Sequence, residues 1–146
     1  MVILVIYMKK IKIYSLLSNS DNENTTIEAL ADFDKEKNII KYKEEDLQVT
    51  IQILDKKVII ERKNEEYDLN LIFSQNERVT CKYQVDFIGL NLEIDVYTKI
   101  LEIEENRIYI NYELFNDNKS IGTFEYKLLI MEWCYEHKKN IKRNNW

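Results

Sequence analysis

The 146-residue sequence predicts an all-β protein, a single antiparallel meander β-barrel of about eight to ten strands with a short C-terminal helix or tail. Three observations support this fold class. Apolar residues recur at every second position between residues 9 and 131, as in strands with one buried and one solvated face. The segments between these runs are short and polar, which indicates antiparallel neighbours. A long meander also has two free edges that can pair, so a closed barrel is favoured over a sandwich.

The expected strands follow directly from the alternation. In chain order they are 9–17, 25–33, 38–43, 47–54, 57–62, 66–73, 78–87, 90–100, 107–115 and 121–131. The pattern is clearest in 47–54, where the odd-numbered residues from Leu47 to Ile53 are apolar and Gln48, Thr50 and Gln52 lie between them. This segment therefore predicts a strand with one face in the core.

The alternation changes face between two of these segments. Odd-numbered residues are apolar in 78–87, whereas even-numbered residues are apolar in 90–100. A continuous strand cannot change face in this way, so a turn or bulge is expected at Ile88 and Gly89, because glycine takes positive φ at little steric cost. The inward residues expected in the second segment are Leu90, Leu92, Ile94, Val96, Thr98 and Ile100.

The chain is expected to form one domain over residues 1–146, with the barrel in 9–131. Residues 1–8 are apolar and are either an upstream extension, with Met8 as the physiological start, or an edge strand. They are too few to span a bilayer and lack the features of a secretory signal, so a cytoplasmic protein of bacterial type is expected. Residues 132–146 break the alternation and predict a short helix or a frayed basic tail.

Charge separates the barrel segment from the C-terminal tail. Residues 1–137 hold 17 Lys and Arg against 26 Asp and Glu, a net charge of −9, while the last nine residues carry four bases and no acid. A body of this charge repels phosphate backbones and anionic lipid surfaces. Neither nucleic acid nor a membrane is therefore expected as a partner.

The residues that usually carry chemistry are scarce, so no enzyme activity, metal site or cofactor is predicted. Cys81 falls on a buried face and the one histidine, His137, lies in the tail, which leaves no base in the body for a cysteine or serine nucleophile. Acidic clusters at 44–46, 65–68 and 102–105 are read as solvated turns and faces. An enzyme with a carboxylate or tyrosine general acid would need a shielded carboxylate, for which Glu125 is the nearest candidate.

Hydroxyl-bearing residues on the apolar faces are the candidate ligand site. The predicted lining residues are Tyr67, Tyr83, Thr98 and Tyr112, and Tyr126 belongs to the same set. Several such side chains converging on one interior could line a cavity for a small molecule with a polar end. The other interpretation is a filled core with the hydroxyls at the barrel mouth, and strand number alone does not decide between them.

The chain resembles the DUF1934 family of YwiB-like bacterial β-barrel proteins, described as calycin-like or lipocalin-like and of unknown function. The resemblance covers roughly residues 9–131. It is carried by the strand-and-turn sequences KYKEEDL at 41–47, VIIERKN at 58–64, LIF at 71–73, YQVDFIGLNLEIDVYTK at 83–99 and RIYINYELFNDNKSIG at 107–122. The resemblance implies a closed or nearly closed barrel and brings no site residues, and the small apolar ligands of calycin relatives are a fold-level analogy.

Two functional hypotheses follow. In the first, the barrel interior binds a small apolar or amphipathic molecule. In the second, the interior is packed and the protein acts as an interaction or scaffold module through its outer surface, where Tyr97 and Tyr109 are expected, and through its tail. Both leave open whether the protein forms a homodimer.

Overall fold

The computed structural model describes residues 8–132 and confirms the all-β prediction. Its strands are β1 Met8–Asn19, β2 Asn24–Asp34, β3 Ile39–Glu44, β4 Leu47–Leu54, β5 Lys57–Lys63, β6 Tyr67–Ser74, β7 Arg78–Val85, β8 Leu90–Ile103, β9 Arg107–Asn116 and β10 Lys119–Glu132. A 3-10 turn, η1 Asp86–Ile88, joins β7 to β8 at the predicted change of face. No helix in these residues is long and apolar enough to span a membrane. The predicted Met8 start and the predicted helix or tail involve residues 1–7 and 133–146, which lie outside the described part.

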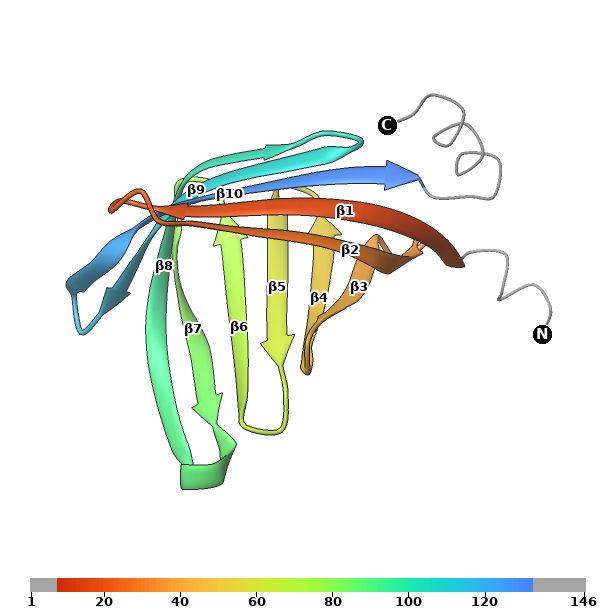
Figure 1. Cartoon of the computed structure of the whole chain (residues 1–146). Coiled ribbons are helices and arrows are strands. Elements are labelled where there is room, and N and C mark those ends of the chain that lie inside the picture. The colour runs from red at the N-terminus through yellow and green to blue at the C-terminus, as the bar shows by residue number, and fades with distance from the viewer. Residues whose placement is uncertain (1–7, 133–146) are drawn as a thin grey trace.

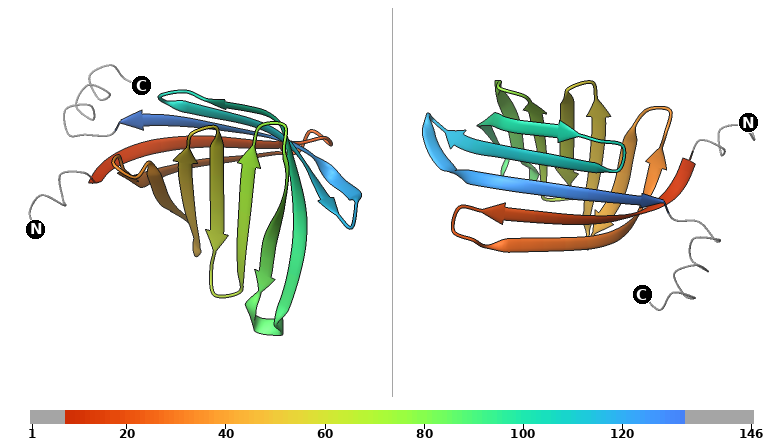
Figure 2. Two further views of the ribbon diagram at one scale, coloured as in Figure 1. Left: turned by 180° about the vertical axis from the view of Figure 1, so that it is seen from behind. Right: turned by 90° about the horizontal axis from the view of Figure 1, so that it is seen from above.

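All neighbouring strands are antiparallel and the sheet closes on itself. Each strand pairs with the next along the chain, and β1 pairs with β10 from Ile11 opposite Glu132 to Asn19 opposite Phe124. Figures 1 and 2 show a flattened barrel in which β1, β2, β9 and β10 form one layer and β3 to β7 cross it steeply in the other. Closure removes the two free edges of the meander, as the sequence predicts.

Strand β8 belongs to both layers because it bends partway along. Figure 1 shows it running beside β7 and then turning to follow β9. The pairing with β9 shifts between Thr98 and Ile100, which makes Lys99 the extra residue of a β-bulge. Bulges let a strand turn the corner between crossed layers. The prediction that Ile100 faces inward is wrong, since the bulge turns it to solvent at 40% exposure and leaves Leu101 half-buried in its place.

Two further residues expected inside lie at the surface. Leu90 and Leu92 are 41% and 36% exposed. They belong to the hairpin of β7 and β8, which extends beyond the neighbouring hairpins in Figure 1 and has no opposite wall at its tip. Alternation within a strand identifies a shared face, but it does not show whether another layer covers that face.

Asparagine and aspartate replace glycine at most of the tight turns. Positive φ angles occur at Asn22, Asn38, Asn76, Asp117 and Asn118, at Glu45 and Lys56, and at both glycines. Asn and Asp tolerate this backbone region better than other residues with a side chain. A chain with two glycines can therefore form so many short hairpins.

The barrel interior is packed with apolar side chains from both layers. Those exposed by 2% or less include Ile11, Ile13, Ile40, Val49, Ile51, Val58, Phe73, Val96, Ile108, Ile110 and Leu128. Cys81, predicted to be a core residue, is 2% exposed, and burial raises the pKa of its thiol. The centre of the barrel is thus occupied by its own side chains, and the two hollows described below, a cavity and a groove, lie at one end and on the outside.

Candidate functional site

The four predicted lining residues form two separate pairs. Thr98 and Tyr112 lie opposite each other on β8 and β9 in the packed centre. Thr98 is fully buried, and its Oγ1 accepts a hydrogen bond from the backbone N–H of Ser74 at 3.2 Å. Tyr112 is 5% exposed and its ring contacts the rings of Phe73 and Phe124, with centroid distances of 4.8 and 5.3 Å.

Tyr67 and Tyr83 lie nearer one end of the barrel. Their rings meet edge to face with centroids 5.8 Å apart, and both side chains are half-buried. The β5–β6 turn positions Tyr67, because Asn64 Oδ1 accepts hydrogen bonds from the backbone N–H groups of Glu66 at 2.8 Å and Tyr67 at 3.0 Å. This is the local hydrogen bonding that favours asparagine in turns.

An ion pair inside the barrel was not expected from the sequence. Glu44 is predicted above to be a solvated turn residue, and this prediction is wrong. It is the last residue of β3 and lies on the same face as the buried Ile40 and Tyr42, so its side chain points inward and is only 13% exposed. Arg62 follows Val58 and Ile60 on the inner face of β5 in the same way, and its guanidinium pairs with the Glu44 carboxylate.

Tyrosine hydroxyls surround this pair. Tyr42 Oη donates a hydrogen bond to Glu44 Oε1 at 3.0 Å, and the Tyr126 hydroxyl hydrogen-bonds with Tyr42 and Ser15. Tyr112 lies close enough for its hydroxyl to interact electrostatically with Tyr126 and Arg62. We call Tyr42, Glu44, Arg62, Tyr112 and Tyr126 the interior polar cluster. The period-two pattern of β3 and β5 was the signal that could have located its two charged members.

Burial keeps the phenols of this cluster protonated. It raises the pKa values of Tyr42 and Tyr112 well above the usual range, and that of Tyr126 to about 12. Nearby groups modify this effect, since the Glu44 carboxylate raises the pKa of Tyr42 further while Arg62 lowers it. At neutral pH all three hydroxyls are therefore hydrogen-bond donors as well as acceptors.

A cavity of about 580 Å³ opens at the adjacent barrel end, between β2 and the β3–β4 and β5–β6 turns. Glu44 and Tyr67 are part of its wall, together with the acidic residues Glu45 and Asp46 and with Glu28, whose carboxylate forms an ion pair with Lys12 at 2.7 Å. Lys43 contributes the one basic side chain among the residues that line it. We call this cavity the acidic mouth. Its volume falls within the range of roughly 300–1,000 Å³ that is common for small-molecule sites.

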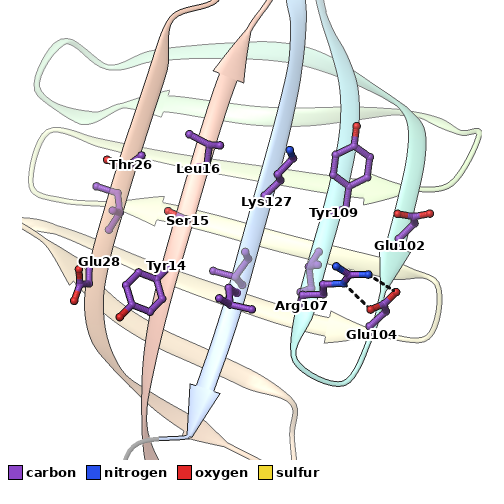
Figure 3. Close-up of a pocket in the computed structure, with 14 residues that line it drawn as sticks. Tyr14, Ser15, Leu16, Thr26, Glu28, Glu102, Glu104, Arg107, Tyr109 and Lys127 are labelled. Atoms are coloured by element: carbon purple, nitrogen blue, oxygen red, sulfur yellow. Dashed lines mark hydrogen bonds and ion pairs between the residues drawn. The ribbon is translucent and has the colours of Figure 1, made fainter. Parts of the chain in front are cut away.

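A second hollow of about 630 Å³ lies on the outside of the barrel, across β2, β1, β10, β9 and β8. Figure 3 shows Leu16, Lys127 and Tyr109 lying side by side across β1, β10 and β9, with Tyr14 farther along β1 and the ion pair of Arg107 and Glu104 at one margin. We call this hollow the outer groove; Leu129, at 42% exposure, is also part of its wall. Tyr109 was expected on the outer surface. The groove itself was not expected, because it depends on the order in which the strands lie side by side.

The remaining candidate groups occupy ordinary positions. Glu125 faces outward on β10 and accepts a hydrogen bond from the Tyr109 hydroxyl, so it is not a carboxylate inside the barrel. Tyr97 is half-buried on the outer side of β8. Within residues 8–132, no three His, Cys, Asp or Glu side chains gather as a metal site would require. His137 lies outside the described residues.

Comparison with known proteins supports the fold and the family. The model of a domain of unknown function, DUF1934, matches residues 11–128. The chain is also similar to the crystal structure of the YwiB protein from Bacillus subtilis, with a TM-score of 0.62 and 18% sequence identity over 88% of this chain and 93% of that one. No curated protein matches the chain. The family match covers most of the barrel, and the resemblance noted in the strand-and-turn sequences is confirmed: the chain belongs to the DUF1934 family.

Proposed function

We propose that the protein binds a small apolar or amphipathic molecule at the acidic mouth, with the molecule's polar end directed toward the interior polar cluster, and that it performs no catalysis. One observation carries this proposal. Glu44, which is part of the wall of a cavity of about 580 Å³ that opens to solvent, pairs with Arg62 and accepts a hydrogen bond from the buried Tyr42. Concave, partly apolar sites with a few convergent polar groups are typical of ligand-binding proteins.

The packed centre limits where such a molecule can lie. Thr98 and Tyr112 contact other core side chains, so an apolar chain would occupy the mouth beside Tyr67 and Leu47. The predicted ligand site is thereby moved toward the end of the barrel, where Tyr67 is part of the wall and Tyr83 packs edge to face against Tyr67. A cytoplasmic location, without nucleic acid or membrane as a partner, belongs to the same proposal.

Native mass spectrometry of gently purified full-length protein tests the proposal. We expect an adduct that disappears on denaturation and that is reduced in Tyr67→Ala, which removes part of the mouth wall. Leu129→Ala is the matched control, because this residue lines the outer groove and not the mouth. The proposal fails if wild-type protein carries no adduct and binds no member of a panel of apolar molecules.

The outer groove favours a second candidate function, docking of a protein partner on the outside of the barrel. Its floor combines aromatic and aliphatic side chains with a charged margin, as in many interaction surfaces. The measurement is the subunit count of purified protein. We expect Leu129→Asp to abolish self-association if the groove is the contact between two copies, and an unchanged dimer in this variant would exclude that contact.

A further inference from the structure

The edge of β2 that faces away from β1 is unpaired along most of its length. Although β2 begins at Asn24, its pairing with β3 within residues 8–132 runs from Asp32 opposite Lys41 to Asp34 opposite Ile39. In the right-hand view of Figure 2, the orange β2 lies at the margin of its layer, beside β1 and with no strand on its other side. Closure of the barrel between β1 and β10 therefore leaves an exposed strand edge on β2.

The hairpin of β1 and β2 shows which backbone groups point to this edge. Asn19 N–H donates to the carbonyl of Glu23 at 3.1 Å, and these two residues continue the register of the ladder. Hydrogen-bonded pairs alternate along antiparallel strands, so the odd-numbered residues of β2 bond to β1. The N–H and C=O groups that point to the unpaired edge consequently belong to the even-numbered Thr26, Glu28 and Leu30.

These backbone groups are accessible and have no hydrogen-bond partner in residues 8–132. All three residues are exposed, and Leu30 keeps 55% of its surface. The seam between β6 and β7 is also paired over few residues, but there a side chain takes over, since Ile72 N–H donates to Cys81 Sγ at 3.3 Å. The described residues provide no such substitute beside β2, so another strand can pair there.

The side chains along this edge determine which strand fits. On the inner face Ile27 and Ala29 are half-buried, and Ile27 is part of the wall of the acidic mouth together with Leu47. Glu28 lies between them on the outer face, and its ion pair with Lys12 leaves its side chain 56% exposed. Residues directly opposite each other on neighbouring strands interact. An added strand therefore fits best with apolar residues opposite Ile27 and Ala29 and a basic residue opposite Glu28.

A second copy of β2 is a poorer occupant of this edge. If two copies paired through all three unpaired positions, Thr26 would lie opposite Leu30, and Glu28 would lie opposite the same residue of the other copy. Like charges directly opposite each other destabilise a pair of strands. The edge thus favours a strand of different sequence.

We propose that the edge of β2 from Thr26 to Leu30 binds an extended segment of another protein by strand addition, with a basic residue opposite Glu28 and apolar residues opposite Ile27 and Ala29. Main-chain hydrogen bonds supply the affinity and alternating side chains supply the selectivity, as in other strand-addition sites. The inference goes beyond the proposed function, because the recognition element is the backbone of β2 and not the cavity.

Peptides with a methylated backbone test the main-chain pairing. The probe is the peptide TKVKVKVKT with blocked ends, titrated into the full-length protein at pH 7.5 and followed by calorimetry. N-methylation of its lysines removes the N–H groups that face β2, whereas N-methylation of its valines removes N–H groups that face away. We expect the first change to weaken binding by at least about tenfold and the second to have a much smaller effect. No binding of the unmodified peptide, or equal binding of the two methylated peptides, overturns the proposal.

Amide hydrogen exchange locates the bound peptide. With the peptide at saturation, exchange of the N–H groups of Thr26, Glu28 and Leu30 should slow by at least about tenfold, because these groups become hydrogen-bonded. The N–H groups of Ile27 and Ala29 already bond to β1 and should change little. Slowing on another strand, without slowing at these three positions, contradicts the proposal.

The charge preference is tested by Glu28→Lys. This variant should bind TKVKVKVKT about tenfold more weakly and should prefer TEVEVEVET, in which glutamate replaces lysine. Glu104→Lys is the matched control, because it makes the same change of charge and also breaks an ion pair, but lies in the outer groove. Equal losses in the two variants would reduce the preference to net charge and refute the assigned position of the basic residue.

Discussion

Two tyrosines of the interior polar cluster differ in hydrogen bonding, because the hydroxyl of one donates a hydrogen bond within residues 8–132 and that of the other does not. Comparing their phenylalanine variants measures what this hydrogen bond contributes to stability. Tyr42 and Tyr112 are 4% and 5% exposed, so replacing either with phenylalanine removes one hydroxyl from a largely buried side chain. The Tyr42 hydroxyl donates to Glu44 at 3.0 Å, whereas that of Tyr112 forms no hydrogen bond within residues 8–132. The same chemical change should therefore lower stability at Tyr42 and have little effect at Tyr112.

The magnitudes follow from the partners. A hydrogen bond to a charged group contributes about 1.5–3 kcal/mol, and because Glu44 keeps a little contact with water we expect Tyr42→Phe to lower the free energy of unfolding by about 2 kcal/mol. The Tyr112 hydroxyl is not among the buried side-chain atoms that lack a partner in residues 8–132, so it keeps contact with solvent. We expect Tyr112→Phe to change the free energy of unfolding of the ligand-free protein by less than about 1 kcal/mol.

Urea unfolding at pH 7, followed by circular dichroism, measures both variants. The slope of the free energy against urea concentration should stay unchanged, so that the midpoints alone report stability. Thermal midpoints should differ between the two variants by roughly 4–8 °C, since 1 kcal/mol corresponds to about 2–4 °C for a chain of this size. Equal losses in the two variants, or a larger loss in Tyr112→Phe, would refute the hydrogen-bond assignment.

Three further outcomes are expected. The free energy of unfolding should fall as pH rises from about 10 toward 12, because the unfolded phenols ionise near pH 10 while burial keeps folded Tyr126 protonated; titration of Tyr126→Phe should show a smaller fall. Lys56→Gly should raise the free energy of unfolding, measured in urea, by about 1 kcal/mol, because Lys56 has a φ of 60°, which is costly for a residue with a side chain. An unchanged free energy of unfolding would contradict the strain at this turn. Thr98→Val should lower stability by roughly 1–3 kcal/mol, since it leaves the Ser74 N–H buried without an acceptor, and a neutral effect in the same assay would argue against that bond.

Much of the fold could be predicted because the information is local. Period-two alternation located every strand of the described part, and the change of face placed the turn at Ile88 and Gly89. The bulge at Lys99 was missed because no glycine or polar break marks it. It is imposed by the need of β8 to pair with β7 in one layer and β9 in the other.

The candidate site could be predicted only in part. Tyr67 and Tyr83 were recognised as aromatic residues on inner faces and lie near the mouth. Glu44 was assigned to solvent because it stands beside Glu45 and Asp46, although it shares a strand face with Tyr42. A charged residue at the end of a strand is normally solvated, and only the approach of Arg62 from another strand makes the inward position favourable.

By itself, the sequence determined the all-β class, the strands, the antiparallel meander and the buried position of Cys81, because these depend on alternation and on short connections. The tertiary structure decided the register in which β1 pairs with β10, the packed centre around Tyr112, and the meeting of Glu44 with Arg62. It also decided the outer groove, in which Tyr14 and Tyr109 lie on either side of β10. Each of these features involves residues that are far apart in the chain. How close such residues lie in space depends on strand order and register, which no local sequence pattern specifies.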